Sequence, residues 1–275
     1  MANLSVKEMI SAGVHFGHQS KYWNPKMRPF IFTTYKKIHI INLDKSIERF
    51  RSASTFIEKL AKNNSKILFV GTKRAAREII QRHATNVKMP YVNNRWLGGM
   101  LTNFDTVKKS IQKLEDLKRH LERSKLLEDI TKKETLSIKK QITKLEKNLY
   151  GIKDLERLPD ALFVIDTRYE KIAIQEANKL NIPVIAIVDS NNSFDGVDYM
   201  IPGNDDSMSS IELFVSEISK IINNNQQQIQ TKPDNHGSPR KSSKKKQVIE
   251  IEKKKQVIEL EKDKSKKQSE SNKKD

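Results

Sequence analysis

The sequence predicts an α/β protein with a parallel sheet flanked by helices, an inserted helical hairpin and a basic tail. Short, fully apolar runs alternate with helical patterns, which indicates parallel strands that are buried on both faces. Between them, apolar residues recur every three or four positions among charges, as in two helices paired in a coiled coil. We assign residues 1–105 and 150–224 to the α/β domain, 106–149 to the hairpin and 225–275 to the tail.

The first third of the chain begins with a capping box. Ser5 and Glu8 should start a short helix that ends at Gly13. Residues 14–37 are dense in His, Gly, Pro, aromatic and Lys residues, and we expect them to be ordered but irregular. The strands that we expect next lie at 38–42, 66–70 and 91–92, and the helices at 47–60 and 75–84.

The later part of the chain contains the hairpin and three more strands. A second capping box, formed by Thr131 and Glu134, should start the second hairpin helix, which Gly151 ends. Apolar strands and helices with one apolar face then alternate. We expect strands at 162–165, 184–188 and 199–201, and helices at 171–180 and 207–222.

The charge of the chain points to an anionic partner. The formal net charge is +18, of which residues 226–275 contribute +7, so residues 1–225 carry +11. A basic folded body typically binds nucleic acid or an anionic membrane surface. The lack of cysteine excludes disulfides and thiolate metal sites. Because the sequence has no signal peptide and no run of about 18 apolar residues, we expect no membrane partner.

The tail differs from the rest of the chain in composition. Residues 223–275 lack aromatic residues and contain a tandem nonapeptide, KKKQVIEIE at 244–252 and KKKQVIELE at 253–261. Such a segment cannot bury enough apolar surface to fold alone. We therefore expect a disordered, Lys-rich extension.

The segment 21–29 interleaves cations with aromatic rings. RNA binding uses cations for phosphates and flat rings or amides for unpaired bases. The alternative is that the rings anchor a loop on the core among solvated lysines. We predict RNA contacts from Lys21, Tyr22, Trp23, Asn24, Lys26 and Arg28.

The segment 93–103 places an arginine and two asparagines before a Gly-Gly pair. Glycines allow a close approach to another backbone, and arginine can bind phosphate through two N–H groups. The alternative is a tight turn with Trp96 in the core, and both interpretations can hold together. We predict RNA contacts from Asn94 and Arg95, and a core position for Trp96.

The segment 71–77 resembles a phosphate cradle, because a strand, Gly-Thr-Lys and a helix follow one another. Neither glycine pattern of the common nucleotide-binding loops is present, which disfavours nucleotide hydrolysis. RNA phosphates suit the three cations better. We predict such contacts from Lys73, Arg74 and Arg77.

Histidines and aspartates leave a metal site open. His15 and His18 have no third ligand at a diagnostic spacing, so we interpret them as structural. Asp166 and Asp189 close strands, where α/β proteins place ligand-binding groups, but turn formation by aspartate is the interpretation we prefer. We assign no metal and no cofactor, while a structural Mg²⁺ or Zn²⁺ stays open. Further aspartates of this set lie at 195, 198, 205 and 206.

Nine segments, taken in order, resemble bacterial ribosomal protein S2 of the small subunit. The resemblance runs through about residues 1–222 and implies an α/β domain with a protruding hairpin at the neck of the small subunit. It also implies contacts with ribosomal RNA and docking of ribosomal protein S1, which captures messenger RNA. The segments are HFGHQ (15–19), YWNPKM (22–27), PFIF (29–32), IHIINL (38–43), ILFVGTKRAA (67–76), NNRWLGGMLTNF (93–104), LPDALFVID (158–166), IPVIAIVD (182–189) and IPGNDD (201–206).

The expected function is therefore that of a structural constituent of the small ribosomal subunit in the bacterial cytoplasm. Its partners would be ribosomal RNA and other ribosomal proteins, including S1, with no catalytic activity and no small-molecule substrate. One alternative is a nucleotide-dependent α/β enzyme, which the missing glycine pattern disfavours. Another is a DNA-binding regulator, for which the sequence has no helix-turn-helix or zinc-finger signature.

Overall fold

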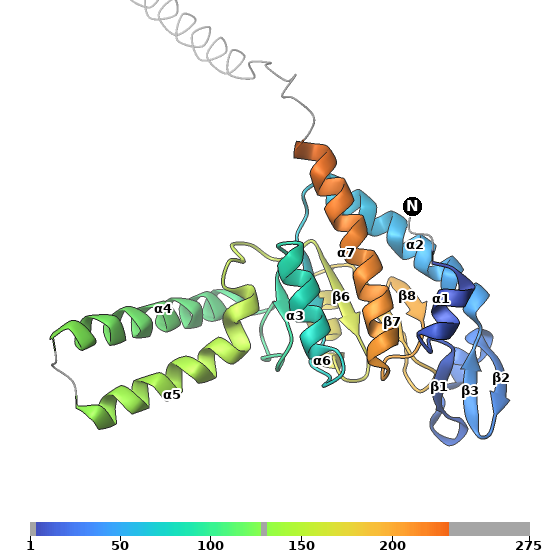
Figure 1. Ribbon diagram of the computed structural model, residues 1–275, viewed down its shortest axis with the longest axis horizontal. Coiled ribbons are helices and arrows are strands. Elements are labelled where there is room, and N and C mark those ends of the chain that lie inside the picture. The colour runs from blue at the N-terminus through green and yellow to red at the C-terminus, as the bar shows by residue number, and fades with distance from the viewer. Residues whose placement is uncertain (1–3, 128–130, 231–275) are drawn as a thin grey trace, which may run out of the picture. The chain divides into compact units, whose positions relative to one another are not determined.

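Five parallel strands form the main sheet of the computed structural model, which describes residues 4–127 and 131–230 (Figure 1). Their order is β5-β4-β6-β7-β8, and all neighbours are parallel. The central strands are apolar and buried, which confirms the predicted α/β fold. The strands span Ile67–Val70 (β4), Tyr91–Val92 (β5), Ala161–Ile165 (β6), Val184–Val188 (β7) and Tyr199–Pro202 (β8).

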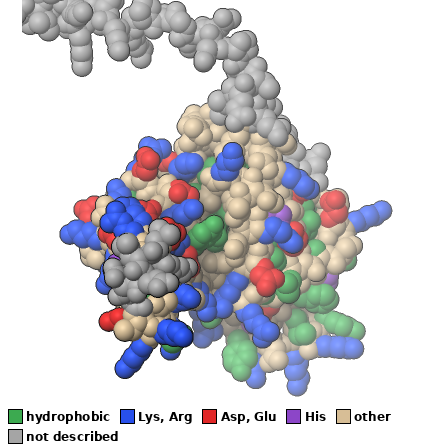
Figure 2. All heavy atoms as spheres, turned by 60° about the vertical axis from the view of Figure 1, so that its left-hand side comes forward, with side chains coloured by type: hydrophobic (Ala, Val, Ile, Leu, Met, Phe, Trp, Pro, Cys, Tyr) green, Lys and Arg blue, Asp and Glu red, His purple; other side chains and the backbone are tan. Residues whose placement is uncertain are grey.

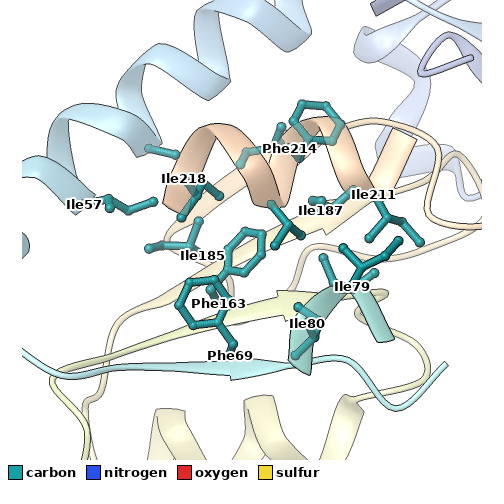
Figure 3. Packing of buried hydrophobic residues seen from close by; sticks show 14 of the residues in the cluster. Ile57, Phe69, Ile79, Ile80, Phe163, Ile185, Ile187, Ile211, Phe214 and Ile218 are labelled. Atoms are coloured by element: carbon teal, nitrogen blue, oxygen red, sulfur yellow. The ribbon is translucent and has the colours of Figure 1, made fainter. Parts of the chain in front are cut away.

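Two hydrophobic cores lie on the two faces of this sheet, because successive strand residues point to opposite sides. On one face, Phe163 and Ile185 pack with helices α2, α3 and α7 (Figure 3). On the other face, Leu162 packs in a second core with α6 and Trp96. These helices span Leu43–Lys62 (α2), Arg77–Asn86 (α3), Lys171–Lys179 (α6) and Met208–Gln230 (α7).

A second, antiparallel sheet forms in the segment that we expected to be irregular. Its order is β1-β3-β2, with β1 at Phe16–Gln19, β2 at Ile31–Tyr35 and β3 at Ile38–Ile41. Only β3 was predicted. The turn between β2 and β3 consists of two lysines, Lys36 and Lys37, at φ of 46° and 66°. Such turns normally contain Asn or Gly, so a pair of lysines does not predict a hairpin.

Short helices connect this sheet to its surroundings. Helix α1 (Val6–Ser11) begins at the predicted capping box, in which Ser5 and Glu8 bond reciprocally. The 3₁₀ helices η1 (Ser20–Tyr22) and η2 (Pro25–Phe30) link β1 to β2.

The hairpin is formed by α4 (Phe104–Leu127) and α5 (Lys132–Leu149) and extends away from the main sheet (Figure 1). The predicted capping box begins α5. A Lys118–Glu146 ion pair of 2.6 Å joins the two helices. The base of the hairpin, including Val107, belongs to the second core, so it is continuous with the α/β fold. The 3₁₀ helix η3 (Tyr150–Ile152) follows.

Helix α7 continues beyond its predicted end at residue 222 and runs to Gln230. Asn225 is buried, and its Nδ2 donates to the carbonyl oxygen of Ile221 at 2.8 Å. The helix thus continues beyond residue 225, where we placed the start of the tail. The remainder of the predicted tail, 231–275, lies outside the described residues. Across 4–127 and 131–230, no helix is long and apolar enough to cross a membrane.

Candidate nucleic-acid interface

The segment between β1 and β2 is anchored on the carboxyl end of β7. Asn24 donates its backbone N–H to the Ser190 carbonyl oxygen at 2.8 Å, and its side chain caps η2 by accepting from Lys26 N at 3.0 Å. Met27 and Phe30 are buried beneath the segment. The anchoring that we weighed as the alternative is therefore present, but Met27 and Phe30 perform it.

The cations and rings predicted for this segment face outward. Lys21, Tyr22, Trp23 and Arg28 are exposed. Lys21 Nζ lies 4.5 Å from the centre of the Tyr22 ring, and the Trp23 ring packs on that of His39 at 5.6 Å. These contacts orient the rings without covering them.

Lys26 is also exposed, but its ammonium pairs with the Asp195 carboxylate at 2.7 Å. The same hydrogen bond holds the pKa of Asp195 below its usual value. Exposed pairs of this kind are screened by water and salt and contribute little to stability. Lys26 can therefore exchange this partner for a phosphate.

In the segment 93–103, Arg95 is exposed while its neighbours are engaged. The Asn94 side chain donates to Asn148 of α5 at 2.6 Å, which ties the segment to the hairpin base. Trp96 is 8% exposed and lies in the second core, as predicted. Its indole N–H donates to the Glu176 carboxylate at 3.1 Å.

One buried carboxylate organises the turn that follows Trp96. Glu176 of α6 accepts from the indole, from the backbone N–H groups of Gly99, Leu101 and Thr102, and from the Thr102 hydroxyl, at 2.7 to 3.1 Å. Burial raises the pKa of Glu176, but these hydrogen bonds outweigh it and leave the pKa below its usual value. Glu176 thus fixes Trp96, the neighbour of Arg95, and the turn that follows it.

The Gly-Thr-Lys turn is filled by another carboxylate of the chain. Thr72 donates its backbone N–H and its hydroxyl to Glu170 at 2.7 and 2.6 Å. Glu170 is buried, and burial raises its pKa. Arg77 Nε donates to the Thr72 carbonyl oxygen at 2.8 Å and so stiffens the turn. Arg74 is exposed.

Lys73 points inward, where we expected it to face RNA phosphates. Its ammonium contacts the carboxylates of Asp205 at 2.6 Å, Asp166 at 3.2 Å and Asp206. Burial lowers the pKa of Lys73, but the three carboxylates outweigh it and raise the pKa well above its usual value. The ends of β6 and β8 bring these aspartates together, a contact that no local pattern in the sequence indicates.

The same acidic cluster includes a histidine. His18 Nδ1 lies 2.9 Å from Asp189, and Nε2 lies 3.1 Å from Asp206. The hydrogen bond with Asp189 raises the pKa of His18, and burial raises that of Asp205 to about 8. Ligand atoms of these four residues lie within 4.8 Å of one another. Carboxylate and imidazole groups are ligands for divalent cations, but the Lys73 ammonium already pairs with Asp205 and Asp206 of this cluster.

Comparison with known proteins decides the family. The family model described as ribosomal protein S2 matches residues 9–225. A protein named small ribosomal subunit protein uS2, from Pseudoalteromonas translucida (strain TAC 125), is 52% identical over 222 residues, which cover 81% of this chain and 91% of the relative. The chain belongs to the ribosomal protein S2 family. The resemblance inferred from the nine segments is confirmed.

Every RNA-binding residue predicted from the sequence lies inside the region that matches the S2 family, which ends before residue 226. Sequence reasoning missed Glu170 and Glu176. A signal existed for Glu176, because it lies beside Ala177 and three residues after Ala173 on the apolar face of α6, where a charged residue needs a buried partner. Glu170 follows a tyrosine in a turn and offered no such signal.

Proposed function

We propose that this chain is a structural, non-catalytic component of the small ribosomal subunit in the bacterial cytoplasm, where it binds ribosomal RNA and neighbouring ribosomal proteins. The observation that carries the proposal is the 52% identity to a small-subunit protein over 91% of that protein. The charge of +11 on residues 1–225 supports an RNA partner. The family resemblance supports the proposed roles in subunit assembly, in translation and in the docking of S1.

The geometry refines the residues that we propose for RNA contact. Exposure favours Lys21, Tyr22, Trp23, Arg28, Arg74 and Arg95, with Lys26 available after release from Asp195. Lys73 leaves the set, because its charge is matched by buried carboxylates. We interpret three of the predicted residues as supports that position the exposed cations. Asn24 and Arg77 bond to the backbone, and Asn94 bonds to Asn148.

The Gly-Thr-Lys turn supports a non-catalytic reading over a nucleotide-dependent enzyme. A phosphate cradle offers its backbone N–H groups to the ligand. Here the Thr72 N–H and hydroxyl donate to Glu170, so an internal anion occupies the position that a phosphate would need. No small-molecule substrate or cofactor is part of the proposal.

Sedimentation of a cell lysate tests the proposal. The tagged full chain should co-migrate with small subunits in stoichiometric amount, and a chain that stays at the top of the gradient would contradict it. With purified RNA, Arg74→Ser combined with Arg95→Ser should weaken binding and reduce the slope of log K against log salt by about 0.7–0.9 for each lost contact. Lys59→Ser, an exposed cation on α2, is the matched control.

A further inference from the structure

The three-stranded sheet exposes aromatic rings on one face. Phe16 and Tyr35 are 48% and 63% exposed. Phe16 is the cross-strand partner of Ile40, and Tyr35 that of Ile38. Because residues two apart in a strand share a face, and cross-strand partners do too, both rings stand on the face that carries Ile38 and Ile40.

A third ring borders the same face. Phe32 is 73% exposed and, together with Ile40, lines an apolar hollow of about 310 Å³. Val6 and Ile10 of α1 line its other side and are themselves exposed. Contiguous exposed apolar groups of this kind mark an interaction site in soluble proteins. Hydrophobic side chains gather beside Lys or Arg side chains at the lower right of Figure 2, the region of this sheet.

The chain segment that carries these rings is basic, although Asp44 lines the hollow beside Phe32. No Asp or Glu occurs between Glu8 and Asp44, whereas this stretch contains five Lys or Arg residues. Lys36 Nζ lies 5.4 Å from the centre of the Tyr35 ring. Lys36 and Lys37 form the β2–β3 turn in the left-handed region, where Asn and Gly are favoured. The turn thus places two positive charges at the end of the strand that carries Tyr35.

We propose that the face of the β1–β3–β2 sheet is a stacking platform for unpaired bases of RNA. Phe16, Phe32 and Tyr35 contact the bases, and Lys36 and Lys37 contact the adjoining phosphates. Rings that stand on an open sheet beside cations are how several RNA-binding modules hold single strands, since every base has a flat face. The proposal deepens the proposed function and rests on it, because it names the class of RNA that this surface binds.

Two RNA probes separate stacking from plain charge attraction. The full chain is titrated with a labelled, unstructured RNA of adenosine and uridine, and with a duplex of similar length, at one fixed salt concentration. Phe32→Ala combined with Tyr35→Ala should weaken single-strand binding by roughly tenfold or more for each ring that a base covers. Duplex binding should stay within about twofold, because paired bases cannot stack on the rings.

Matched variants keep the result interpretable. Tyr150→Ala combined with Tyr169→Ala removes two exposed tyrosines outside the three-stranded sheet and should leave both affinities unchanged. Tyr35→Phe retains a flat ring and should bind as the wild type does. Circular dichroism of each variant confirms folding.

Three outcomes would overturn the inference while leaving the proposed function standing. Equal losses for single strand and duplex would show that the rings do not act by stacking on unpaired bases. Unchanged single-strand affinity, in a variant that no longer enters small subunits, would show that a neighbouring protein covers the face. Wild-type chain that enters subunits without binding the single strand would also exclude the platform. Failure of the wild type to enter subunits would instead reject the proposed function.

Discussion

Removal of the Glu176 carboxylate is the perturbation whose effect follows most directly from the structure. Replacing Glu176 by alanine leaves five donors without their acceptor. The Trp96 indole and the Leu101 N–H are buried, and an unsatisfied buried donor costs roughly 1–3 kcal/mol. The other three donors are partly buried, so water replaces part of what they lose. We expect Glu176→Ala to lower the free energy of unfolding by about 4 kcal/mol.

Urea unfolding at neutral pH, followed by tryptophan fluorescence, measures this loss. In a thermal melt the same change corresponds to a decrease of roughly 8–16 °C for a domain of this size. Glu176→Gln keeps one acceptor oxygen but turns an amide N–H₂ toward N–H donors. Its loss of unfolding free energy should therefore be more than half that of Glu176→Ala. Glu48→Ala, an exposed glutamate on α2, is the control. A Glu176→Ala variant within about 1 kcal/mol of the wild type would refute the assignment of these bonds.

Three further predictions concern acid stability, the acidic cluster and the hairpin. Because the folded-state pKa of Glu176 lies below its usual value of 4.5, the stability that its carboxylate contributes is full above pH 4.5 and is lost as the pH falls through the folded-state pKa. Glu176→Gln should therefore reduce the loss of unfolding free energy at acid pH, measured by urea unfolding at a series of pH values. The same acid dependence in the variant and the wild type would exclude Glu176 as its cause. Lys73→Met leaves buried carboxylates without their cation and should lower the free energy of unfolding by about 3–5 kcal/mol. Arg74→Met removes an exposed neighbouring cation and should change that free energy by less than about 0.5 kcal/mol. Equal melting temperatures for the two variants would contradict the inward placement of Lys73. Replacing residues 116–140 with a Gly/Ser linker should leave the α/β part folded, since the buried hairpin residues Val107, Ile111 and Leu149 remain. Circular dichroism measures this, and global unfolding would show that the outer hairpin is integral to the core.

The predictability of the fold differs between its two sheets for a physical reason. Strands β6 and β7 are buried on both faces, so their apolar runs are visible in the sequence without knowledge of any partner. Strands β1 and β2 are largely exposed, and their residues follow no alternation of apolar and polar side chains. The lysine turn between β2 and β3 removed the remaining signal. Exposure of these strands is therefore the reason that the pattern did not predict them.

The candidate site was predictable in its segments but not in its individual contacts. The pattern strand, Gly-Thr-Lys, helix specifies a turn with N–H groups and cations close together, and that much is local. Which anion fills the turn is decided by a residue far along the chain. Glu170, 98 positions after Thr72, accepts a hydrogen bond from the Thr72 N–H. Asp205, 132 positions after Lys73, pairs with the Lys73 ammonium. The anions that bind this turn thus come from the chain itself. Exposed cations such as Arg74 are the ones that we propose for an RNA backbone. A local motif therefore predicts the chemistry of a turn, whereas the fold determines whether that chemistry serves a ligand or the protein itself.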